Sequence, residues 1–193
     1  MNRTWRIALV VAVLGGAAAS PGWGQRPQRR DGFWIGFGVG YGWANVSCDG
    51  CLGVARTGGP TAFLKLGGTV SPHVLLGGQV NAWAHDGGGS TEGMANVTAS
   101  LYYYPVARSG LFLTGGLGFS DYSTDSRPAF EGSGWGLTLG VGYDVRVGRN
   151  VSLTPVLHWV YGGVGDVNQN GVGPAFTGWR QDVIDVGLGV TFH

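Results

Sequence analysis

Two cysteines form the pair of side chains in this chain with the clearest potential for chemistry. Cys48 and Cys51 are separated by two residues, a spacing found in redox-active thiols, in zinc sites and in small disulfide loops. A redox motif would need a helix start beside a strand, and a zinc site would need a second ligand pair. We therefore expect a disulfide that stiffens a loop, with no metal and no cofactor; an unpaired, reduced state is the alternative.

A second set of polar side chains is scattered through otherwise apolar segments and could take part in proton transfer or ion pairing. It consists of Lys65, Gln79, Asn81, Asp144, Arg146, His158 and Asp185. A histidine beside a carboxylate can move a proton, but buried polar groups usually satisfy one another. We expect a structural network without catalytic residues, in which His158 pairs with Asp185 and Asp144 pairs with Arg146.

The elements that must position these residues repeat every two residues. From Phe33 to Trp43, every odd position is large and apolar, and every even position except Trp34 is glycine. Side chains of a β-strand point alternately to opposite faces, so one face of this segment is apolar and the other almost bare. The glycines do not fit a G-x-G-x-x-G nucleotide loop, because they recur at every second residue.

Eight segments share this alternation, and they cover residues 33–43, 62–70, 74–82, 95–103, 111–119, 135–147, 151–161 and 184–192. A tilted strand needs about ten residues to cross a bilayer. Short connections alternate with longer ones, which are centred near Ser47, Gly88, Thr124 and Gly171. The pattern predicts an all-β fold, an eight-stranded antiparallel up-and-down transmembrane β-barrel with short periplasmic turns and longer extracellular loops.

Composition also favours a surface that meets lipid. Only 12% of the residues are charged, and the formal net charge is +1, so we expect no nucleic-acid partner. In the predicted barrel the aromatic residues sort into an outer set (Tyr41, Trp43, Phe119, Trp135, Trp159, Tyr161) and an inner set (Phe33, Tyr103, Tyr143, Phe192). Such girdles are typical of membrane barrels. A soluble barrel with an apolar interior is the alternative, but glycine would then dominate its outer face.

The N-terminal residues predict export. Arg3 and Arg6 precede an apolar run over residues 7–14 that passes into small residues, as in a secretory signal peptide. We assign residues 1–24 to the signal peptide, with cleavage between 19 and 25, residues 25–31 to a periplasmic lead-in, and residues 32–193 to the barrel. An uncleaved anchor is the alternative, although the run is shorter than the ~20 apolar residues of a spanning helix.

Four rings are expected inside the barrel near its periplasmic end, and they belong to Trp34, Tyr102, Tyr104 and Phe112. An eight-stranded barrel has room for little more than its own side chains. We therefore expect these rings to plug the periplasmic end of the lumen.

Three segments, at residues 110–119, 135–143 and 186–192, resemble the small outer-membrane barrels of Gram-negative bacteria. The chain is similar to the membrane domain of outer membrane protein A and to outer membrane protein X. The resemblance implies location in the outer membrane, contact with lipid and lipopolysaccharide, and insertion by the barrel-assembly machinery. The assembly signal it implies consists of Val186, Leu188, Val190 and Phe192. His193 departs from the family pattern, because it follows the terminal aromatic residue.

The expected function is non-enzymatic. We expect a monomeric barrel that is a rigid mount for surface loops, with a role in envelope integrity or in surface interaction with an extracellular ligand. One alternative is a narrow pore for small or apolar solutes. Another is a lipid A-modifying enzyme, but the His-x-Ser arrangement of lipid A deacylases is absent, because Val160 stands two residues after His158.

Overall fold

The computed structural model describes residues 30–51, 55–169 and 172–193, so the predicted signal peptide and residues 25–29 of the lead-in lie outside the described residues. No helix that could span a membrane occurs in these three ranges. The strands are β1 (Phe33–Ser47), β2 (Thr57–Ser71), β3 (Val74–Gly87), β4 (Ser90–Tyr103), β5 (Leu111–Thr124), β6 (Phe130–Tyr143), β7 (Val145–Arg146), β8 (Val151–Gln169) and β9 (Gly173–Phe192).

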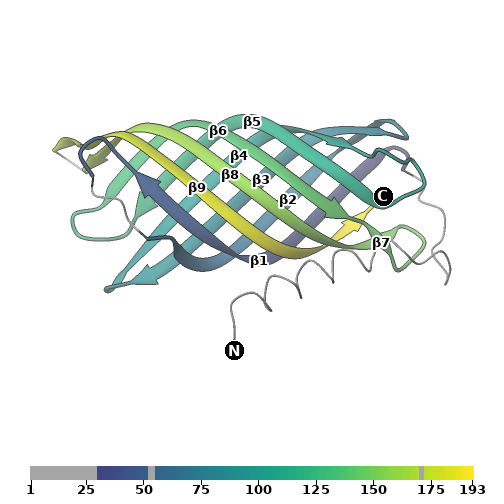
Figure 1. Cartoon of the computed structure of the whole chain (residues 1–193), viewed down its shortest axis with the longest axis horizontal. Helices are drawn as coiled ribbons and strands as arrows, with labels where there is room; N and C mark the ends of the chain where they lie inside the picture. The colour runs from purple at the N-terminus through teal and green to yellow at the C-terminus, as the bar shows by residue number, and fades with distance from the viewer. Residues whose placement is uncertain (1–29, 52–54, 170–171) are drawn as a thin grey trace, which may run out of the picture.

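The strands form one closed antiparallel sheet (Figure 1). Only Asp144 separates β6 from β7, and both pair with β8, so they act as one strand of the barrel. Each strand pairs with the next along the chain, and β1 pairs with β9 to close the ring. The prediction of an eight-stranded up-and-down barrel is confirmed. The C-terminus and β7 lie at the same end of the barrel in Figure 1, and we call this the inner end.

The outer segments differ in form from the loops that the sequence predicted. The last two strands, β8 and β9, have 19 and 20 residues and extend far beyond the predicted ranges. The connection between β3 and β4 consists of Gly88 and Gly89 alone, with φ of 62° and 86°. Two positive φ values suit a two-residue hairpin turn. Ladder hydrogen bonds therefore continue past the apolar band, and much of the outer surface is paired strand.

The outward side chains form a broad apolar surface. Val39, Leu117 and Phe119 are 68%, 65% and 77% exposed in the isolated chain. Rings gather towards the outer end of this surface, where the ring centroids of Trp135 and Tyr161 are 5.2 Å apart. A continuous apolar face of this extent is far larger than soluble proteins expose, and its natural solvent is lipid.

Candidate functional site

The inward side chains fill the barrel in successive layers. Six of the seven polar residues singled out in the sequence are buried inside it, at 0–5% exposure: Lys65, Gln79, Asn81, Asp144, His158 and Asp185. The seventh, Arg146, is half-buried near the inner end. The lumen is therefore where a catalytic centre, a pore or a structural core would have to be built.

The four predicted rings form the layer that we call the aromatic plug. Trp34, Tyr102, Tyr104 and Phe112 are each 1–2% exposed and pack in one cluster. The ring centroids of Trp34 and Tyr102 are 4.9 Å apart, and those of Tyr104 and Phe112 are 5.4 Å apart. Lys65 Nζ lies 4.6 Å from the ring centroid of Phe112, a cation–π contact. Three further members of the cluster were not predicted from the sequence, and they are Phe63, Leu75 and Val156.

Asp144 is the centre of a second layer, which we call the inner seal. Its carboxylate accepts hydrogen bonds from the hydroxyls of Tyr104 and Thr154, both at 2.8 Å. His193 Nε2 lies 3.6 Å from the same carboxylate. His193 turns inward because it follows the outward Phe192 on a strand. The residue that departed from the family pattern thus packs into the inner seal.

Arg30 is buried against the inner seal. Its guanidinium donates hydrogen bonds to the carbonyl oxygens of Ala107 at 2.9 Å and Ser109 at 2.6 Å. Its Cζ atom lies 3.5 Å from the ring centroid of Tyr104. The residue that precedes the barrel is therefore tied across its inner mouth to the connection between β4 and β5.

A middle network lies on the other side of the aromatic plug. Tyr102 Oη donates to Gln79 Oε1 at 2.6 Å, and Gln79 Nε2 lies 2.9 Å from Asn81 Oδ1 and 3.3 Å from His158 Nε2. An amide nitrogen can only donate, so His158 Nε2 accepts and its Nδ1 carries a proton, 3.4 Å from Asp185 Oδ1. His158 and Asp185 are each 3% exposed, so these contacts are buried inside the barrel.

Further towards the outer end, the lumen contains residues that sequence reasoning missed. Ser120 Oγ donates to Asn96 Oδ1 at 2.8 Å, and Gln181 Nε2 donates to Ser120 Oγ at 3.0 Å. Beyond them lies an apolar layer, the outer cluster, made of Ala44, Trp83, Met94, Tyr122, Val160, Val164, Val167, Trp179 and Val183. In the sequence, the two-residue alternation of inward side chains continues past the outer aromatic set, and this continuation could have predicted the outer cluster.

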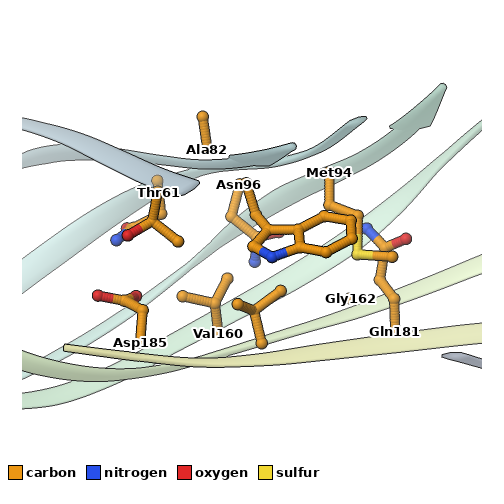
Figure 2. A pocket seen from close by; sticks show the side chains of 11 residues that line it. Thr61, Ala82, Met94, Asn96, Val160, Gly162, Gln181 and Asp185 are labelled. Atoms are coloured by element: carbon orange, nitrogen blue, oxygen red, sulfur yellow. The ribbon is translucent and has the colours of Figure 1, made fainter. Parts of the chain in front are cut away.

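A small cavity lies between the middle network and the outer cluster. The side chains of Thr61, Asn96, Gln181 and Asp185 surround it (Figure 2). Its volume of about 10 Å³ is room for roughly one water molecule. The side chains of the middle network fill the lumen on the inner side of this cavity, and those of the outer cluster fill it on the outer side.

Glycines on the lumen face make room for these layers. A Cβ on Gly38 would lie 2.5 Å from Phe63 Cζ, and one on Gly189 would lie 2.6 Å from the same atom.

We predict that Gly38→Ala lowers the free energy of unfolding by about 1–3 kcal/mol, because the added methyl overpacks the lumen. Gly68→Ala is the control, since a Cβ there meets nothing within 4 Å. Urea titration of the refolded variants in lipid vesicles measures both; equal stabilities would contradict the packing.

The remaining predicted residues lie outside the lumen. Cys48 and Cys51 form a disulfide, and the Asp49 amide between them donates to the Thr177 carbonyl at 2.9 Å, which ties this loop to β9. The four residues of the implied assembly signal project outward from β9; Val186, Leu188 and Phe192 are exposed, and Val190 is half-buried. No group of three or more His, Cys, Asp or Glu side chains in the described ranges is placed to hold a metal.

Comparisons with known proteins agree with this architecture. Residues 7–192 match the model of a family described as the outer membrane protein beta-barrel domain. Neisserial surface protein A is 18% identical, with a TM-score of 0.54 over 86% of this chain and 99% of that one. The attachment invasion locus protein of Yersinia pestis is 12% identical, with a TM-score of 0.52 over 84% and 99%. No curated protein matches the sequence. At such low sequence identity, these structural matches establish a shared fold and nothing more.

Proposed function

The chain belongs to the outer membrane protein beta-barrel domain family, and we propose that it is a non-enzymatic, closed barrel that holds an outer contact surface in place. Proteins of this family lie in the outer membrane of Gram-negative bacteria, surrounded by lipid and lipopolysaccharide. We further propose that the barrel is inserted by the assembly machinery through its outward β9 residues and acts as a monomer.

The filled lumen is the observation that carries this proposal. The inner seal, the aromatic plug, the middle network and the outer cluster follow one another along the barrel, and the cavity among them holds about one water molecule. A solute would have to displace several buried layers at once. Among the polar residues that could do chemistry, hydrogen bonds join Gln79 to Asn81 and His158, and His158 to Asp185, and all four side chains are buried.

The distribution of charge supports the outer end of the barrel as the contact surface. Eight of the eleven Asp and Glu residues lie beyond the outer aromatic set, together with three arginines: Asp49, Asp86, Glu92, Asp121, Asp125, Glu131, Asp166 and Asp182, with Arg56, Arg127 and Arg180. The Yersinia protein was crystallised with a polyanionic heparin analogue. The outer end of this chain is acidic, so it favours contact with cationic groups and not with a polyanion.

Solute flux tests the proposal. Vesicles that contain the refolded protein should show no swelling in arabinose or glycine beyond that of protein-free vesicles. Expression in a Gram-negative host should leave the lipid A mass spectrum unchanged. Swelling that grows with the amount of protein would favour the narrow pore instead, and a new lipid A species would favour an enzyme.

A further inference from the structure

A pocket opens at the outer end of the barrel, beyond the outer cluster. Its walls come from β1 to β4 and from Ala55 before β2, and its volume of about 360 Å³ is within the range of small-molecule sites. Trp83, His85, Glu92 and Met94 are the side chains that give the pocket its chemistry, and Thr57 and Ser90 add hydroxyls.

The floor of the pocket is apolar and fixed. Trp83 and Met94 lie opposite each other across β3 and β4, and they are 3% and 5% exposed. Trp83 Nε1 donates to the Gly42 carbonyl at 3.3 Å, which holds the indole in place. Both side chains also line the small inner cavity, so they form the wall between the pocket and the closed lumen. A ligand here meets an apolar surface without entering the barrel.

Three of the polar side chains around this floor, those of His85, Ser90 and Glu92, can accept hydrogen bonds. Glu92 is half-buried, and Tyr122 Oη donates to its Oε1 at 3.3 Å. His85 Nδ1 lies 3.0 Å from the Gly58 carbonyl and must donate to it, so Nε2 of the neutral ring is an acceptor. The hydroxyl proton of Ser90 is directed at the Gly87 carbonyl, 3.3 Å away.

The charges near the pocket favour a cation. The described lining contains one carboxylate, that of Glu92, and neither lysine nor arginine. Arg56 adjoins the lining but pairs with Asp182 at 2.6 Å. The acidic residues of the outer end add a long-range attraction for cations.

We infer that this pocket binds a small organic ammonium ion that carries an apolar group, with the ammonium at Glu92 and the apolar part against Trp83 and Met94. The inference rests on the proposed role of the outer end as a contact surface, and it names the chemistry of the ligand. Charge-assisted hydrogen bonds to a half-buried carboxylate give the affinity its dependence on ligand charge.

Calorimetry on the full folded protein in detergent micelles tests this inference, with benzylammonium as the probe and benzyl alcohol as its neutral counterpart. Benzylammonium should bind about tenfold more tightly than benzyl alcohol or better, as expected for hydrogen bonds to a charged group. Glu92→Gln should remove that preference. Glu131→Gln, which neutralises a carboxylate of the outer end outside the pocket, should keep it.

The indole N–H signal of Trp83, assigned with Trp83→Phe, provides a second measurement. It should shift on addition of benzylammonium to the wild-type protein. Equal binding of the two probes, an unchanged preference in Glu92→Gln, or a Trp83 signal that does not move would each overturn the inference. The vesicle-swelling experiment contains neither benzylammonium nor benzyl alcohol, so a failure of the ammonium site and a failure of the closed barrel are seen separately.

Discussion

Replacing Val39 by arginine should lower the free energy of unfolding in lipid vesicles by about 2–4 kcal/mol, the cost of an arginine at the bilayer midplane of a membrane barrel. Val39 is 68% exposed and lies between Phe33 of the inner aromatic set and Trp43 of the outer set. Its partners across the two strand pairs are Ala62 and Leu188. An arginine at position 39 would therefore face two apolar cross-strand neighbours, neither of which can form a hydrogen bond with its side chain.

The matched control for this substitution is Val172→Arg. Val172 is 77% exposed and lies in the outer connection between β8 and β9, where arginine meets water. Its effect should remain within about 0.5 kcal/mol, as for most surface changes. Urea titrations of both variants, followed by tryptophan fluorescence, give the comparison. If the two arginines have the same effect, the outward face does not meet lipid.

Asp144→Ala should lower the free energy of unfolding by about 2–5 kcal/mol. The substitution leaves the buried hydroxyls of Tyr104 and Thr154 without their acceptor. It also removes the carboxylate that His193 faces. Asp31→Ala, which removes an exposed carboxylate at the same end, is the control and should leave stability nearly unchanged.

The same urea titration measures this pair of variants, and the migration of unheated samples on detergent gels verifies that each barrel forms. An Asp144→Ala protein as stable as Asp31→Ala would mean that the inner seal contributes nothing to stability.

The alternation around Phe33–Trp43 predicted the fold because membrane strands must place apolar side chains on one face along their whole transmembrane length. It could not predict where the strands end. Beyond the lipid the outward face becomes polar and the alternation fades, although hydrogen-bonded pairing continues to Gln169 and Gly173. The outer hairpins were therefore predicted as loops.

In the lumen, the inward faces and a contact between adjacent strands could be predicted from the sequence, whereas contacts across the barrel could not. Strand alternation assigns His158 and Asp185 to the inside, and adjacent strands bring them together. The contact of Gln79 with His158 joins β3 to β8, which are not neighbours in the sheet, and depends on the curvature of the whole barrel. Short-range patterns contain no information about such contacts across the lumen.

Fluorine NMR of the wild-type protein labelled with fluorotryptophan tests the central claim, a lipid-facing barrel with a filled lumen, most directly. Spin-labelled lipid should broaden the signals of Trp43, Trp135 and Trp159, which are 39–53% exposed on the outward face. A water-soluble paramagnetic agent should leave Trp34, which is 2% exposed in the aromatic plug, unaffected. Broadening of Trp34 by the soluble agent would show a water-filled lumen and would contradict the closed barrel.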